Sequence, residues 1–204
     1  ALPFEYNNLE SLESLAKTFH DEIGVIIMEP RREHPPEQGF LEGVRMVANK
    51  LGAVLIFDEV TSGFRMNMGG IHLTYGVFPD IAVFGKALGN GFPISAIVGS
   101  RSVMENAQDS FISSTFWTER IGFVSALATI EKMEKNNVQN DLERYGDLIN
   151  EGWIKLAEYH GLKISISGIS PLTHIKFETD TPLTVQTLYA QEMLKNGYLL
   201  GSAI

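Results

Sequence analysis

Residues 53–99 read AVLIFDEVTSGFRMNMGGIHLTYGVFPDIAVFGKALGNGFPISAIVG, and the rest of the chain is organised around them. Its first apolar run, Ala53–Phe57, ends at Asp58, and its second, Ile81–Phe84, is followed by a glycine and then Lys86. Short apolar runs that stop at charged residues or glycine are typical of buried parallel strands. We therefore predict an α/β sheet in which Asp58 and Lys86 follow neighbouring strands.

The side chains at these two strand ends suggest a binding site. Reactive groups of open α/β sheets gather just past the carboxyl ends of the strands. An acid and an amine there can hold a ring between them, and an amine that is partly desolvated beside glycines is a nucleophile toward an aldehyde. Spacing alone, however, favours a surface lysine at position 86 and an ordinary turn cap at Asp58.

The residues before this stretch complete a strand–helix–strand unit. Ile23–Met28 is an apolar strand, and Phe40–Leu51 is an amphipathic helix with Gly52 at its C-terminal cap. Asn7 or Asn8 can cap an earlier helix. Because such units are almost always right-handed and short-linked, we predict a mostly parallel sheet with helices on both faces.

The pattern changes near Asn136, where we place a domain boundary. We assign residues 1–136 to part of a large domain and residues 137–204 to part of a small α+β domain. In the second part we expect a long helix, two strands, a helix and a last strand, over residues 138–160, 162–167, 172–177, 183–195 and 199–204.

Composition argues against several classes of partner. The chain has 204 residues and a formal net charge of −9, whereas nucleic-acid binding requires a basic surface. No apolar stretch is as long as a membrane span, and no signal peptide is visible. There are no cysteines, and the five histidines lack metal-ligand spacing. We expect a cytoplasmic protein with no metal, nucleic-acid or membrane partner.

The motifs of residues 53–99 resemble those of the class III aminotransferases that depend on pyridoxal 5′-phosphate (PLP), and more closely the glutamate-1-semialdehyde 2,1-aminomutase branch. The resemblance extends from about Gly24 to the C-terminus. It implies the large domain of the PLP-dependent transferase fold, fold type I, and a chain that is a fragment of a longer enzyme. The matching motifs, in the family's order, are Asp58-Glu59-Val60, Gly63-Phe64-Arg65, Gly76-Val77, Pro79-Asp80-Ile81, Gly85-Lys86 and Gly91-Phe92-Pro93.

The resemblance implies roles for four residues. Lys86 would be the catalytic lysine that forms a Schiff base with PLP, and Asp58 would pair with the pyridine nitrogen. Val60 would pack on one face of the ring, and Thr115 would reach the phosphate of the cofactor in the partner subunit of a homodimer. The chain departs from the family at residues 117–120, where WTER replaces the usual glycine, asparagine and proline. Trp117 and Arg120 suggest a substrate bulkier than an amino acid.

Two further residues, Glu29 and Arg65, are weaker candidates. Glu29 matches a family position near the cofactor. Arg65 could bind a substrate carboxylate as a fork, although a structural salt bridge is the more common use of a loop arginine. We assign Glu59 a structural pair and no chemistry.

Two other readings remain at this point. Leu55–Glu59 has the form of a Walker B strand, in which Asp58 would hold Mg²⁺ in a P-loop ATPase. That enzyme also needs a G-x-x-x-x-G-K-[ST] loop, which the chain lacks. A non-catalytic interaction fragment is the other alternative. We predict a PLP-dependent aminotransferase or aminomutase that acts on a small amino substrate.

Overall fold

The chain divides into two compact units. The computed structural model describes residues 1–31 and 33–200, and the division falls between Gln139 and Asn140. Among the described residues, no helix is both long enough and apolar enough to cross a membrane.

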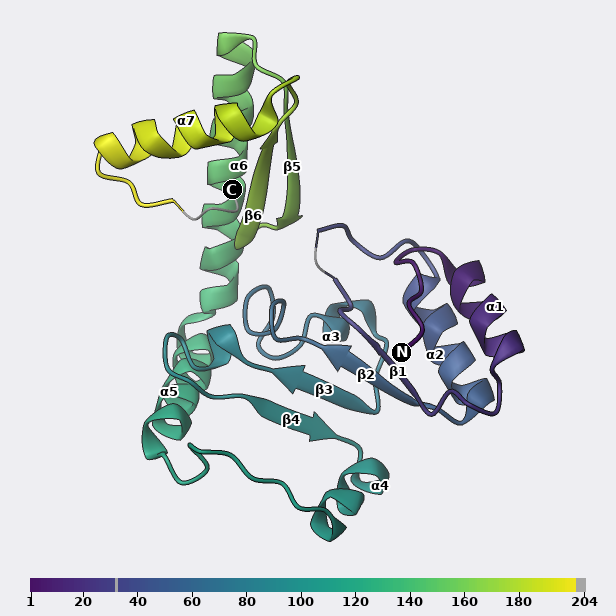
Figure 1. The fold of residues 1–204 in the computed structure, drawn as a ribbon. Coiled ribbons are helices and arrows are strands. Elements are labelled where there is room, and N and C mark those ends of the chain that lie inside the picture. Colours follow the sequence, from purple (N-terminus) through teal and green to yellow (C-terminus); the bar gives the residue numbers. More distant parts are fainter. Residues whose placement is uncertain (32, 201–204) are drawn as a thin grey trace. The chain divides into compact units, whose positions relative to one another are not determined.

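A four-stranded sheet lies at the centre of the first unit (Figure 1). β1, β2 and β3 run parallel, with Met28 opposite Phe57 and Asp58 opposite Val83, whereas β4 runs antiparallel to β3. The predicted mostly parallel sheet, with its first two strands as neighbours, is confirmed. The strands in spatial order are β1 (Val25–Met28), β2 (Val54–Asp58), β3 (Ile81–Phe84) and β4 (Ala96–Gly99).

Local sequence signals set the ends of the helices that connect the strands. α1 (Leu9–Thr18) begins after Asn8, whose side chain accepts a hydrogen bond from the backbone N–H of Ser11 at 3.1 Å. α2 (Phe40–Leu51) stops at Gly52, whose φ of 66° suits a residue without a β-carbon. The later helical elements of this unit are α3 (His72–Tyr75), η1 (Lys86–Leu88), α4 (Arg101–Met104), η2 (Glu105–Asp109) and α5 (Arg120–Asn136).

Both long helices that pack on the sheet contact the same face. α2 packs in one apolar cluster with side chains of β1 and β2, and α5 packs in a second cluster with side chains of β3. The strand side chains buried there are Ile26, Leu55, Phe57, Ala82 and Phe84.

The opposite face of the sheet, which we call the open face, carries the alternate strand residues. Val25, Ile27 and Ile97 on this face are 53%, 58% and 59% exposed. Helices were predicted on both faces, but in the part of the chain that the structure describes α2 and α5 lie on one. The chain therefore contains an apolar sheet face that these helices leave uncovered.

The second unit is built around an antiparallel hairpin. β5 (Ile164–Ile169) and β6 (Leu172–Phe177) follow α6 (Val138–His160) and precede α7 (Pro182–Lys195). The ring of Phe177 packs edge-on against Tyr189 of α7, with 5.4 Å between the centroids. The predicted last strand is not found at residues 199 and 200, which are irregular, and residues 201–204 lie outside the described part of the chain.

Asp80 ties three elements of the first unit together. Its Oδ2 accepts hydrogen bonds from Arg45 of α2 at 2.8 Å and from the backbone N–H of Leu55 in β2 at 2.7 Å. Its own N–H donates to the carbonyl of Leu55 at 2.8 Å. One carboxylate therefore fixes α2 and β2 to the residue that precedes β3.

We expect Asp80→Ala to lower the free energy of unfolding of the first unit by about 2–3 kcal/mol, because it leaves two partly buried donors, one of them cationic, without an acceptor. Urea denaturation followed by circular dichroism would measure the loss. The control is Asp109→Ala at an exposed position, which should change stability by no more than about 0.5 kcal/mol. Equal losses in the two variants would contradict the role given to Asp80.

Candidate functional site

Two parallel strands carry Asp58 and Lys86 to the same edge of the sheet. Asp58 is the last residue of β2, and Lys86 follows β3 as the first residue of η1. Because side chains alternate along a strand, Asp58 continues the open face, whereas Leu55 and Phe57 point into the core. The structure thus places both residues at neighbouring strand ends, as the sequence predicted.

Lys86 combines a strained backbone with an exposed side chain. Its φ of 42° lies in the left-handed region, which residues with a β-carbon rarely adopt. Its Nζ donates a hydrogen bond to Oγ1 of Thr61 at 2.9 Å. The partial desolvation suggested by the sequence is not seen, because the side chain is exposed.

Asp58 and Val60 are joined by a tight turn. Oδ1 of Asp58 accepts a hydrogen bond from the backbone N–H of Val60 at 2.9 Å, as in an Asx-turn. Its other oxygen, Oδ2, makes no hydrogen bond to the described residues. A β-carbon added at Gly85 would lie 3.5 Å from the side chain of Val60, so Val60 sits beside the glycine that precedes Lys86. Val60 is therefore in contact with Asp58 and lies beside the residue that precedes Lys86.

Glu59 points the other way, into the core, and is fully buried. Its carboxylate accepts hydrogen bonds from Ser62 Oγ at 2.5 Å and from the backbone N–H and ring Nδ1 of His72 at 2.9 and 2.8 Å. Burial by itself would raise the pKa of Glu59, but the hydrogen bonds from His72 and Ser62 outweigh it and lower the pKa. The structural pair expected for Glu59 is present, with His72 as its partner.

Thr115 lies in a separate loop, between η2 and α5. All of residues 110–119 are exposed, and the hydrogen bonds of Asp58 and Lys86 go to Val60 and Thr61 rather than to Thr115. Glu119 caps α5 by accepting a hydrogen bond from the backbone N–H of Ile121 at 3.1 Å. The described hydrogen bonds do not connect Thr115 to the other three predicted residues, so its role across a subunit interface stays a prediction.

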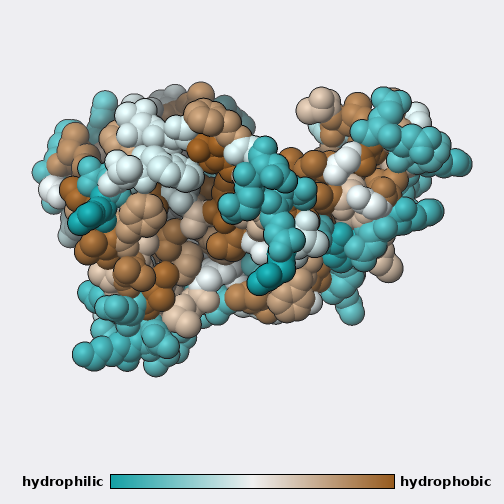
Figure 2. Space-filling view, turned by 90° about the horizontal axis from the view of Figure 1, so that it is seen from below, coloured by the Kyte–Doolittle hydropathy of each residue, from teal (hydrophilic) through white to brown (hydrophobic). Residues whose placement is uncertain are grey.

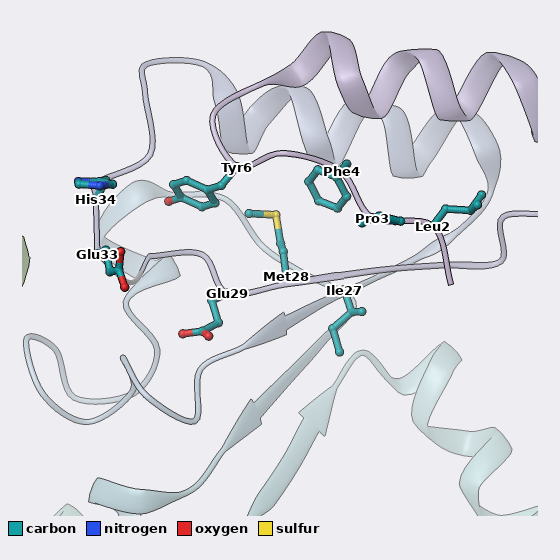
Figure 3. A pocket seen from close by; sticks show the side chains of 9 residues that line it. All are labelled: Leu2, Pro3, Phe4, Tyr6, Ile27, Met28, Glu29, Glu33 and His34. Atoms are coloured by element: carbon teal, nitrogen blue, oxygen red, sulfur yellow. The ribbon is translucent and has the colours of Figure 1, made fainter. Parts of the chain in front are cut away.

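Glu29 lines a cavity of about 510 Å³ at the carboxyl end of β1 (Figure 3). Figure 3 shows the side chains of Glu29, Glu33 and His34 toward one end of this cavity and the apolar residues 2–4 toward the other. Asp58, Val60 and Lys86 are not among its lining residues. The cavity is therefore distinct from the predicted site.

Thr61 is the site residue that sequence reasoning missed. Its hydroxyl accepts from Lys86, and its carbonyl accepts from Nε of Arg65 at 2.7 Å. Arg65 is half-buried, and burial lowers the pKa of its guanidinium. Part of the fork proposed for a substrate carboxylate is thus used within the turn. The available signal was the position of Thr61 in the turn that directly follows Asp58.

The side chains at this sheet edge suit a ring that carries a basic nitrogen and an aldehyde. Oδ2 of Asp58 is open to a protonated ring nitrogen, and Lys86 presents an exposed primary amine. Val60 offers an apolar side chain beside Gly85, which precedes Lys86. These residues therefore fit the ring of PLP.

Comparison with known proteins points to one family. The family model described as Aminotransferase class-III matches residues 4–203. A 3-aminobutyryl-CoA aminotransferase of Cloacimonas acidaminovorans is 36% identical over 185 residues, which are 87% of this chain and 44% of that protein. A glutamate-1-semialdehyde 2,1-aminomutase of Natranaerobius thermophilus is 33% identical, over 88% of this chain and 43% of that protein.

Solved structures agree with the sequence relatives. FumI of Sphingopyxis sp. MTA144, in its PLP internal aldimine form, superposes with a TM-score of 0.92 at 25% identity, over 98% of this chain and 50% of that chain. An omega-transaminase from Sphaerobacter thermophilus gives a TM-score of 0.86 at 25% identity, over 99% and 50%. The predicted transferase fold is confirmed. The chain spans about half the length of the proteins that it matches.

The strained backbone at position 86 gives a paired prediction. Lys86→Gly and Lys86→Ala both remove the amine and its hydrogen bond to Thr61, but only glycine relieves the left-handed φ. We expect the glycine variant to be more stable than the alanine variant by about 1 kcal/mol. Thermal unfolding of the two variants would measure the difference, and equal stabilities would show that the backbone at Lys86 is not strained.

Proposed function

Because this chain belongs to the class III aminotransferase family, we propose that it provides the lysine-bearing part of a PLP-dependent aminotransferase or aminomutase. The observation that carries the proposal is the placement of Asp58 and Lys86 at the carboxyl ends of two adjacent parallel strands. The substrate class is a small molecule with a primary amine, since both kinds of relative act on amino compounds by name.

Each residue of the site has a chemical role in this proposal. When bound, PLP supplies an electron sink for the carbon next to the substrate nitrogen. Asp58 would hold the ring nitrogen in its protonated form through Oδ2, and Val60 would support one face of the ring. Lys86 would bind the cofactor covalently through Nζ and afterwards, as a free amine, accept and return a proton. The hydroxyl of Thr61 lies 2.9 Å from Nζ of Lys86 and would hold the amine in place whenever it is not bound to the cofactor.

We also propose that the protein is a homodimer in which Thr115 completes the site of the partner subunit. The support is an exposed apolar surface, formed by the loop before α5 and by α5 itself, that is unusual for a surface facing only water. Figure 2 shows hydrophobic residues exposed at several places on the face seen from below. The exposed side chains of this loop and helix are Phe111, Ile112, Phe116, Trp117, Ile121, Phe123, Val124 and Leu127.

Trp117 and Arg120 extend the proposal to the substrate. Both are exposed close to Thr115 in the sequence, so the interface that carries Thr115 would also present an aromatic ring and a cation. An acidic substrate larger than an amino acid would use both. A cytoplasmic location without nucleic-acid or membrane partners is also part of the proposal, and the net charge of −9 supports the absence of a nucleic-acid partner.

Borohydride reduction tests the cofactor lysine. Protein that contains this chain would be incubated with PLP, reduced and mapped by peptide mass spectrometry, and we expect the adduct on Lys86. Lys86→Ala should lose the adduct and nearly all turnover. Asp58→Ala should keep the adduct and lose turnover, because the ring nitrogen loses its carboxylate. An adduct on Lys50 or Lys132, or on no lysine, would overturn the assignment.

Light scattering tests the dimer. We expect the mass of two subunits for the parent protein and a shift toward one subunit for Phe111→Ser with Trp117→Ser. The matched control is Tyr159→Ser, an 82% exposed aromatic residue of the second unit, which should leave the mass unchanged. A PLP-loaded protein that remains a stable monomer would contradict the proposal.

A further inference from the structure

Two adjacent carboxylates at the end of β2 have different environments. The alternation along the strand places Asp58 on the open face. Glu59 faces the core, on the same side of the sheet as Phe57. No part of the proposed chemistry uses Glu59. Burying a carboxylate lowers the stability of the fold unless hydrogen-bond donors surround it, so Glu59 depends on its partners.

Glu59, Ser62 and His72 form a buried hydrogen-bonded cluster, which we call the clamp. Because the hydrogen bonds keep Glu59 ionised and acceptor-only, Nδ1 of His72 must carry the proton that it donates. The ring of His72 packs between Phe57 and Phe78, at centroid distances of 5.9 and 6.3 Å. There is no room for a further atom, since a β-carbon at Gly70 would collide with Nδ1 of His72 and lie 2.8 Å from Oε1 of Glu59.

The clamp holds both ends of the segment that contains Thr61. The backbone N–H of Glu59 donates to the carbonyl of Val83 in β3 at 2.8 Å, and its carbonyl accepts from Gly63 at 2.8 Å. Its carboxylate reaches Ser62 and His72, which stand one and eleven residues beyond Thr61. Thr61 therefore lies between anchored points and cannot shift without breaking a buried hydrogen bond.

We infer that Glu59 and His72 are positioning residues, which set the place of Thr61 and, through it, the resting place of the Lys86 amine. The inference deepens the proposed function of Lys86, but it concerns the free lysine and needs no cofactor. A purely structural brace would stabilise the fold equally well without affecting the amine. The two possibilities differ in what happens at Nζ of Lys86 when the clamp is loosened.

The test measures the reactivity of Lys86 in the PLP-free protein. Reductive methylation with formaldehyde and cyanoborohydride would be followed by peptide mass mapping, with Lys50 on α2 as the internal reference. Thr61→Val removes the acceptor directly, and we expect it to raise the labelling rate of Lys86 about two- to fivefold, as for the loss of one exposed hydrogen bond. Thr61→Ser keeps a hydroxyl and should behave like the parent protein.

The clamp variants then decide the inference. Glu59→Gln and His72→Leu should raise Lys86 labelling as much as Thr61→Val, and adding either change to Thr61→Val should give no further increase, because all act through one contact. His72→Gln retains a side-chain N–H and should restore most of the parent rate. Labelling of Lys50 should stay constant throughout, which also reports that the fold is intact.

Two results would overturn the inference. One is a lower melting temperature in Glu59→Gln and His72→Leu with an unchanged ratio of Lys86 to Lys50 labelling, which is the behaviour of a structural brace. The other is an additive effect in the double variants, which would mean that the clamp acts on Lys86 by another route. The proposed function fails separately, by the absence of a borohydride-trapped adduct, and neither failure implies the other.

Discussion

The site depends on the two-residue period of a single strand. β2 is only five residues long, yet its alternation separates Leu55 and Phe57, which anchor the core, from Val54 and Ile56 on the open face. The alternation continues for one position beyond the strand and divides the acidic pair: Asp58, the last residue of β2, faces the open side and Glu59 faces the core. A shift of one residue in the register would exchange these carboxylates and destroy both the binding group and the clamp.

The register of β2 is fixed by hydrogen bonds near both of its ends. Asp80 binds the backbone of Leu55 at the start of β2, and Glu59 binds the carbonyl of Val83 just beyond its end. Near its start, β2 is hydrogen-bonded to Asp80, the residue before β3. Just beyond its end, Glu59 is hydrogen-bonded to Val83 of β3. These contacts hold together segments that lie more than twenty residues apart in the sequence.

Much of the fold was readable from the sequence because local signals agreed with one another. Apolar runs between glycines marked the strands, Asn8 and Gly52 marked helix ends, and the order of the motifs placed Asp58 and Lys86 at adjacent strand ends. The sequence could not show that α2 and α5 lie on the same face of the sheet. Amphipathic periodicity indicates that a helix packs against an apolar surface, but it does not indicate which face of the sheet provides that surface. It also missed the contacts of Thr61 and His72, which depend on the path of a loop with no period to read.

The exposed apolar side chains of the open face affect how readily the chain aggregates while that face is uncovered. β1 and β4 are the outer strands of the described sheet, and β1 carries the exposed apolar side chains of Val25 and Ile27 and no proline or lysine to block a second strand. An edge of this kind can pair with a strand of another chain, so the time for which it stays uncovered sets the risk of aggregation. Production of this protein should therefore be limited less by the stability of its fold than by how quickly that edge is covered.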